Sequence, residues 1–304
     1  MAKLKILLFG GNGLIGSRLR QLLGSKYQIT APSHQKVDVT NKIQVEKIIQ
    51  TLKPYYIVYA TGLTSVDIAE ESPKLAYLLN AKVPAFIAKK AAFLNIPVLY
   101  FSTDAVFDGT KDSNPYFESD KTNPLSLYGK SKLLGEQYVL AASSKNCIAR
   151  IIMAYSHFPT KRKRFVQIAL ETLKKGEEFY GVIDQIINPI YVDDVVWAVY
   201  SLLESGSYGT YHLGATDYVT NFEFVKKLAK YFNLNENLVI GISFEDFFKE
   251  KVAPRTKFCW LDTSKFRKKF GENILHSVDE SIKLFKINFK SLSNSPAVPI
   301  NIPR

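Results

Sequence analysis

The chain is poor in the residues that build disulfide frameworks and metal sites. It has two cysteines, Cys147 and Cys259, and four histidines in 304 residues. Two cysteines cannot form a disulfide framework and indicate a reducing compartment. The histidines lack the spacing of metal ligands, so we predict no metal site. No apolar stretch is long enough to span a bilayer, and the first apolar run soon meets glycines, so we expect a cytoplasmic protein.

Acidic residues are outnumbered by basic ones. The formal net charge is +12 and the pI about 9.4, which first suggests nucleic acid or an acidic surface as a partner. Lysines are spread along the whole chain, however, and the one dense basic run, 161–164, is typical of a solvated loop or a helix start. No nucleic-acid-binding module is recognisable. A general positive field would instead attract small ligands that carry phosphates.

Three glycines follow the first apolar run of the chain. Leu4–Phe9 leads into Gly10, Gly13 and Gly16, and a helical pattern comes next. This order predicts a strand, a tight turn and a helix. Gly10 permits the turn, Gly13 lets the backbone approach a pyrophosphate, and Gly16 lets the helix pack close to the sheet. Such glycines also occur in ordinary turns, but the flanking strand and helix favour a dinucleotide site.

Strand and helix patterns alternate through the first half of the chain. Strands are predicted at 4–9, 27–30, 55–60, 98–101 and 147–152. The alternation predicts an α/β fold with a Rossmann-type, doubly wound parallel sheet. Further helices are expected at 165–175, 193–204, 221–231 and 278–285. We predict a Rossmann domain over 1–153, a smaller α/β substrate-binding lobe over 154–290 from which some segments return to the main sheet, and a loose C-terminal tail over 291–304.

A phenol, an ammonium and a hydroxyl form the candidate catalytic set. Tyr128 and Lys132 stand four residues apart in a predicted helix over 126–142, so both project from one face. A solvated helix face would show the same pair. Thr103 favours the catalytic interpretation of this pair, because it follows a buried strand at the sheet edge where ligands bind. Considered alone, its hydroxyl could simply form a hydrogen bond with nearby backbone groups. Lys132 would stabilise the Tyr128 anion, Thr103 would bind a substrate oxygen, and Tyr128 would donate the proton to a ketone being reduced.

Several segments resemble the dTDP-4-dehydrorhamnose reductase family of extended short-chain dehydrogenases/reductases. The similarity rests on the GxxGxxG turn, on Ser-Thr-Asp-x-Val-Phe-Asp-Gly from Ser102, and on Tyr-Gly-Lys-Ser-Lys from Tyr128. It implies NADPH-dependent reduction of the C4 ketone of a dTDP-linked 6-deoxyhexulose. Dehydration is disfavoured, because Ala105 follows Asp104 where sugar-nucleotide dehydratases carry a second acid.

The resemblance also implies roles for residues outside the catalytic set. Besides Lys132 and the three glycines, cofactor contacts are expected at Leu14, Ile15, Ser33, Asp38, Val39, Ala60, Thr61 and Gly62, although 60–62 could be only a strand-to-loop turn. The substrate is expected to contact Thr64, Val66, Asp104, Met153 and Arg255, the last at its diphosphate. The family usually has tryptophan where Met153 stands, and glycine and threonine where Ile187 and Ile190 stand. Reductase chemistry is therefore better supported than the identity of the sugar.

The residues after the second strand bear on the cofactor. An acid there would bind a ribose hydroxyl and favour NAD, but residues 31–36 are Ala-Pro-Ser-His-Gln-Lys. The missing carboxylate and the presence of Lys36 favour NADPH, with NADH as an alternative donor.

Two other functions stay open at this point. One is an NADP-binding regulatory subunit without turnover, similar to the beta subunit of methionine adenosyltransferase. The other is a nucleotide-sugar epimerase, which would use the same tyrosine and lysine and hold its cofactor tightly. We expect a nucleotide sugar as the partner, neither nucleic acid nor membrane, and either a monomer or a homodimer.

Overall fold

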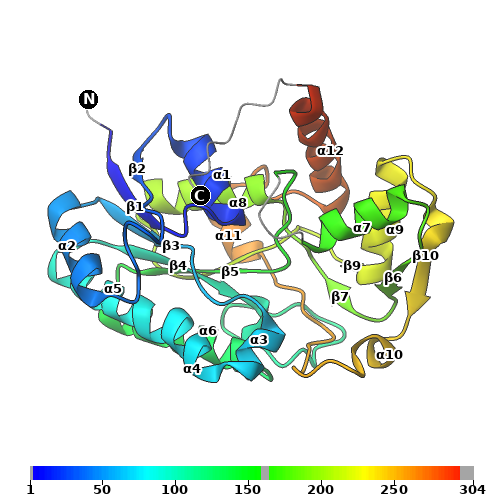
Figure 1. Ribbon diagram of the computed structural model, residues 1–304, viewed down its shortest axis with the longest axis horizontal. Helices are drawn as coiled ribbons and strands as arrows, with labels where there is room; N and C mark the ends of the chain where they lie inside the picture. The colour runs from blue at the N-terminus through cyan, green and yellow to red at the C-terminus, as the bar shows by residue number, and fades with distance from the viewer. Residues whose placement is uncertain (1–2, 159–163, 295–304) are drawn as a thin grey trace.

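A six-stranded parallel sheet forms the centre of the molecule. The computed structural model describes residues 3–158 and 164–294. The strand order is β2-β1-β3-β4-β5-β8, and every neighbouring pair is parallel. The strands are β1 (Lys5–Phe9), β2 (Gln28–Thr30), β3 (Tyr56–Tyr59), β4 (Val98–Thr103), β5 (Cys147–Ile151) and β8 (Gly209–Leu213). The predicted doubly wound α/β fold is confirmed (Figure 1). The order reverses between β1 and β3, which is where such sheets bind ligands.

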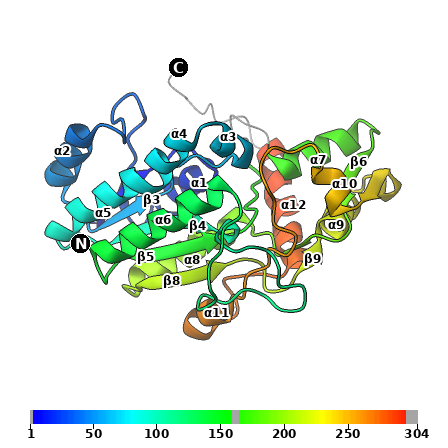
Figure 2. The same ribbon diagram turned by 90° about the horizontal axis from the view of Figure 1, so that it is seen from below.

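Helices cover both faces of this sheet (Figures 1 and 2). Side chains alternate along a strand, so Ile6 and Leu8 of β1 enter one core while Leu7 and Phe9 enter the other. Burial on both faces explains why the strands read as continuous apolar runs. The first core is closed by α1 (Leu14–Leu23), α8 (Val192–Glu204) and α11 (Ser264–Phe270), and the second by α2 (Lys42–Leu52), α5 (Val83–Phe93) and α6 (Leu127–Ala142).

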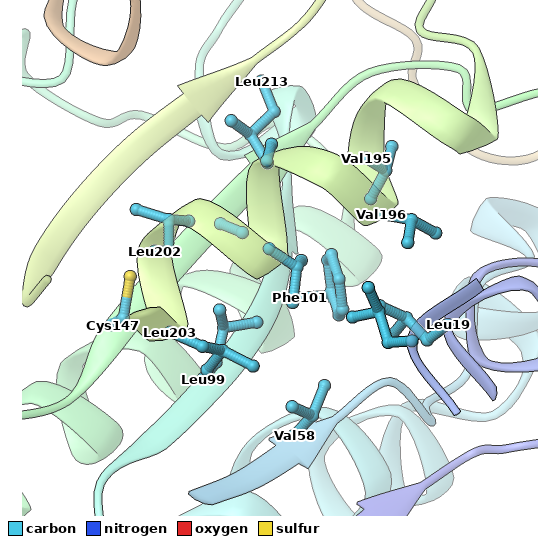
Figure 3. Packing of buried hydrophobic residues seen from close by; sticks show 14 of the residues in the cluster. Leu19, Val58, Leu99, Phe101, Cys147, Val195, Val196, Leu202, Leu203 and Leu213 are labelled. Carbon is cyan, nitrogen blue, oxygen red and sulfur yellow. The ribbon is translucent and has the colours of Figure 1, made fainter. Parts of the chain in front are cut away.

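Figure 3 shows the first core, where Leu99 and Phe101 of β4 lie among side chains of α8 such as Val195 and Leu203. Phe101 is thus fixed by packing directly before the residues expected at the site. The end of β4 is therefore a rigid platform.

A smaller lobe stands beside the sheet, on the right in Figure 1. It contains the parallel pair β6 (Phe179–Val182) and β10 (Val239–Ile242), and the antiparallel pair β7 (Ile186–Ile187) and β9 (Val219–Thr220). Its helices are α7 (Phe165–Lys174), α9 (Asn221–Tyr231), α10 (Phe244–Phe248) and α12 (Val278–Asn294). Helix α9 begins at the predicted residue because Thr220 and Glu223 form a reciprocal capping box.

Short helical segments complete the connections. They are α3 (Val66–Glu71), α4 (Pro73–Tyr77), the π-helical turn η1 (Leu78–Lys82), and the 3-10 turns η2 (Asp104–Val106) and η3 (Glu236–Leu238). No helix in the described ranges is long and apolar enough to cross a membrane.

Two predictions concern the second half of the chain. Helix α12 continues to Asn294, four residues into the segment 291–304 that was expected to be a loose tail, and 295–304 lie outside the described residues. The segments that return to the main sheet from the predicted lobe are α8 and β8, and β8 pairs in register with β5. The basic run is described only at its last residue, Arg164, which precedes α7.

Candidate active site

One cavity of about 590 Å³ opens at the carboxyl ends of β1, β3 and β4. Most of the predicted site residues meet there. The predicted residues in its lining are Gly10, Gly13, Leu14, Ile15, Ala60, Thr61, Gly62, Thr64, Thr103, Asp104, Tyr128, Lys132 and Met153. The lining also contains residues that were not predicted for the site, namely Ser65, Phe101, Ser102, Ile151, Ala154, Arg164 and Phe165. Segments 60–65 and 101–104 thus face helix α6 and the start of the smaller lobe. The cavity has the size range of small-molecule and cofactor sites.

The glycine turn has the geometry of a pyrophosphate cradle. Gly10 has φ +91°, and a Cβ atom there would lie 2.5 Å from the Ala60 carbonyl oxygen. A Cβ atom on Gly16 would lie 2.1 Å from the Gly10 carbonyl oxygen, so this position accepts only glycine. At the start of α1, Gly13 offers no capping side chain and the first turn has no acidic residue. The N-terminal N–H groups and the helix dipole can therefore bind an anionic group, and the residues fit a dinucleotide.

Tyr128 keeps its proton at neutral pH. It lies in the first turn of α6, which Ser126 caps by accepting a hydrogen bond from the Gly129 N–H. Burial raises the pKa of Tyr128 to about 12, a hydrogen bond with Thr103 lowers it, and the charge of Asp104 raises it. The expected stabilisation of the Tyr128 anion by Lys132 stays a prediction. A phenol of this kind is suited to donating a proton rather than to acting as a base.

Lys132 extends from α6 and places its ammonium against strand β4 of the sheet, away from solvent. Its Nζ donates a hydrogen bond to the Phe101 carbonyl oxygen and lies 4.2 Å from the centroid of the Tyr100 ring. Burial lowers the pKa of Lys132 to about 7, and the carboxylate of Glu136 one helical turn away opposes that shift. Lys132 is thus poised between charged and neutral forms near neutral pH.

Thr103 and Asp104 share one hydrogen bond. The Thr103 hydroxyl is 2.8 Å from Asp104 Oδ1, and its Oγ1 also accepts a hydrogen bond of 3.3 Å from the Ala105 N–H. Burial raises the pKa of Asp104 to about 6, while hydrogen bonds from Thr103 and Cys259 lower it. A hydroxyl has a single proton. The Thr103 proton can therefore be donated to Asp104 or to the Tyr128 oxygen, but not to both at once.

Asn80 connects two segments of the site, and it was not among the residues predicted for the site. It lies fully buried in η1, where its amide nitrogen donates to the Leu63 carbonyl and to Ser131 Oγ, each at 3.0 Å. Its backbone oxygen accepts a hydrogen bond of 2.7 Å from the Tyr100 hydroxyl. The side chain therefore joins the loop after β3 to the turn of α6 that separates Tyr128 from Lys132. The signal in the sequence was an asparagine among apolar residues of a helical segment, and π-helical turns are often found at functional sites.

Six predicted contacts lie outside the cavity lining. These are Gly16, Ser33, Asp38, Val39, Val66 and Arg255. Arg255 instead forms an ion pair with Asp67, with Nη2 2.8 Å from Oδ2. Asp38 accepts hydrogen bonds from the backbone and side chain of Thr40. Their contacts with ligands stay predictions.

The positions at which this chain differs from the usual family residues are of two kinds. Met153 lines the cavity and has φ +40°, a conformation that side chains rarely adopt. Ile187 and Ile190 are buried in the core, where their bulk replaces polar or small groups. Among residues 3–158 and 164–294, no cluster of three or more His, Cys, Asp or Glu side chains could hold a metal ion.

Comparison with known proteins adds an independent line of evidence. The family described as RmlD substrate binding domain matches residues 4–285. A dTDP-4-dehydrorhamnose reductase from Aggregatibacter actinomycetemcomitans is 33% identical over 88% of this chain and 93% of its own. Methionine adenosyltransferase 2 subunit beta from Xenopus tropicalis is 30% identical over 87% of this chain and 82% of its own. The crystal structure of dTDP-4-dehydrorhamnose reductase from Bacillus anthracis in complex with NADP superposes with a TM-score of 0.88 at 31% identity, covering 95% of this chain and all of the other.

Proposed function

Because the chain belongs to the RmlD substrate binding domain family, we propose that it reduces the C4 ketone of a dTDP-linked 6-deoxyhexulose with NADPH. The predicted relationship to dTDP-4-dehydrorhamnose reductases, which are NAD(P)-dependent oxidoreductases, is confirmed at the level of the family. The observation that carries the proposal is one cavity that contains the glycine turn, Thr103 and a protonated Tyr128. The identity of the substrate, the carbon atom that is reduced and the roles of the individual residues are what we propose.

The cofactor is assigned from the turn and from a relative. The similar structure from Bacillus anthracis is a complex with NADP, and Gly10, Gly13 and Gly16 here form the turn between β1 and α1 that binds the pyrophosphate in doubly wound folds. The reduced nicotinamide supplies a hydride when bound. NADH stays an alternative donor.

Tyr128 serves as the acid in this proposal. Its pKa of about 12 keeps the phenol protonated, so it can give a proton to the ketone oxygen as negative charge develops there. Thr103 holds the phenol by a hydrogen bond and faces the same oxygen. Lys132, anchored on the Phe101 carbonyl, adds positive charge to the site while it is protonated.

The same features argue against two other reactions. An epimerase must also use the tyrosine as a base, and burial disfavours the phenolate it would need. A dehydratase needs a second acid beside Asp104, and that position is Ala105. The likeness to the beta subunit of methionine adenosyltransferase leaves one alternative worth testing, which is cofactor binding without turnover.

The test is turnover of the wild type beside Tyr128→Phe. NADPH consumption is measured with a dTDP-4-keto-6-deoxyhexose, and NADPH binding is measured separately. We expect Tyr128→Phe to lose about 10²- to 10⁴-fold in kcat while binding NADPH normally. Tyr138→Phe is the matched control, because Tyr138 lies on the same helix and is 44% exposed. Bound NADPH with no turnover by the wild type would favour the regulatory function, and an active Tyr128→Phe would remove Tyr128 from its proposed role.

A further inference from the structure

Arg20 in the last turn of α1 turns back onto the glycine turn. Its Nη1 donates hydrogen bonds to the Gly11 carbonyl oxygen at 3.4 Å and to Asn12 Oδ1 at 3.2 Å. This direction follows from helix geometry, because helical side chains tilt toward the N-terminus of their own helix. The guanidinium is thereby held at the edge of the cradle while the residue stays exposed.

The end of β2 lies at the same place. A Cβ atom built on Gly11 would be 2.5 Å from the Ala31 Cβ and 3.2 Å from the Arg20 Cδ. Gly11 is therefore in contact with the first residue after β2 on one side and with the Arg20 side chain on the other. Three segments, the glycine turn, α1 and the end of β2, therefore meet at Gly11, beside the Arg20 side chain.

In doubly wound folds, the residues at the end of β2 recognise the ribose of a bound dinucleotide. The residue at the end of β2 faces the 2′ position of the adenosine ribose, where an acid selects NAD and a nearby arginine accommodates the 2′-phosphate of NADP. Residues 31–35 contain no acid. Arg20 forms no ion pair within residues 3–158 and 164–294, and both of its hydrogen bonds there start from Nη1. Its remaining donors can serve a phosphate, which a planar guanidinium binds well.

The neighbouring arginine shows the contrast. Arg18 is buried and forms two hydrogen bonds with the Asp193 carboxylate, at 2.5 and 2.7 Å, so it is committed to holding α1 against α8. Lys36, which the sequence analysis connected with the phosphate, is exposed in the turn after β2. Of these three cations, Arg20 alone is held on the glycine turn itself.

We propose that Arg20 binds the 2′-phosphate of NADP(H) and gives the enzyme its preference for this cofactor over NAD(H). The inference rests on the proposed function only in taking a nicotinamide dinucleotide as the ligand. Lys36 is then a surface cation that adds to the general positive field.

The test measures cofactor binding without any sugar substrate. NADPH and NADH are titrated into the wild type, Arg20→Ala, Arg20→Lys and Lys36→Ala, with Lys89→Ala as a control that removes one exposed charge from α5. We expect Arg20→Ala to weaken NADPH about 10- to 100-fold and to leave NADH within about twofold, because only NADPH has the phosphate. Arg20→Lys should retain part of the preference, and added salt should weaken NADPH more in the wild type than in Arg20→Ala.

Each result is informative about one proposal. Equal losses of NADPH and NADH in Arg20→Ala, or no loss of either, would overturn the assignment of Arg20. A selective loss of NADPH in Lys36→Ala alone would move the phosphate to Lys36 and also overturn it. Wild type that binds neither dinucleotide would instead remove the basis of the proposed reductase function. Unchanged thermal unfolding of Arg20→Ala would show that the effect is local.

Discussion

Replacing Glu136 by glutamine is the sharpest test of how the site is held. Glu136 accepts two hydrogen bonds from Arg150, at 2.9 Å from Nε and 2.7 Å from Nη2, and the two side chains are only 3% and 6% exposed. The Arg150 Nη1 lies 3.3 Å from His212 Nε2. Burial and Arg150 lower the pKa of His212 to about 3, so this histidine is neutral and cannot replace the lost charge.

The expected loss of stability is large. Glutamine keeps the shape and one acceptor but leaves the Arg150 cation buried without a counter-charge. Removing one member of a buried pair costs about 3–5 kcal/mol. The matched control is Glu46→Gln, because Glu46 pairs with Lys90 at 2.7 Å but these side chains are 36% and 33% exposed. Exposed pairs contribute less than about 1 kcal/mol.

Chemical denaturation of both variants measures the difference. A double variant, Glu136→Leu with Arg150→Met, removes both charges and should recover much of the lost free energy of unfolding. A Glu136→Gln variant as stable as Glu46→Gln would refute the reasoning. A double variant as unstable as Glu136→Gln would show that the loss comes from packing rather than from an unpaired charge.

The same substitution has an effect on the site. The Glu136 carboxylate raises the pKa of Lys132 against the effect of burial. In Glu136→Gln the pKa of Lys132 should fall below about 7, and the alkaline limb of the activity profile should move to lower pH, because the ammonium that supplies positive charge to the site is lost earlier.

Two further substitutions have definite outcomes. Gly16→Ala places a Cβ atom 2.1 Å from the Gly10 carbonyl oxygen, so the turn must shift, and titration should show that NADPH binding is lost while the chain stays folded. Asp104→Asn acts through linkage: burial raises the pKa of Asp104 from 3.8 to about 6, so the folded state binds the extra proton, and this group's contribution to stability falls as the pH rises from about 4 to 6. The amide removes that dependence. Thermal unfolding should show Asp104→Asn stabilised relative to wild type at pH 7, by up to about 3 kcal/mol, and not at pH 4; equal differences at both pH values would contradict the burial of this carboxyl.

Local patterns were enough to predict most elements of the fold. The strand at 98–101 and the helix from 221 were recognised because burial on both faces and a capping box leave signals within a few residues. The last main-sheet strand, β8, was not predicted. The first two residues of β8 are only half-buried, so its sequence lacks a continuous apolar run. The segment becomes a strand by pairing with β5, which lies more than fifty residues earlier in the chain.

The sequence by itself determined the glycine turn, the parallel sheet and the placement of Tyr128 and Lys132 on one helix face, because each depends on spacing along one segment. Only the tertiary structure decided the chemical state of those groups. The pKa of Lys132 falls and that of Tyr128 rises because of burial by segments distant in sequence. The contact of Gly11 with Ala31 at the end of β2 and the ion pair of Arg255 with Asp67 were likewise set by chain packing. Desolvation and pairing depend on which segments meet in space, and no local pattern records that.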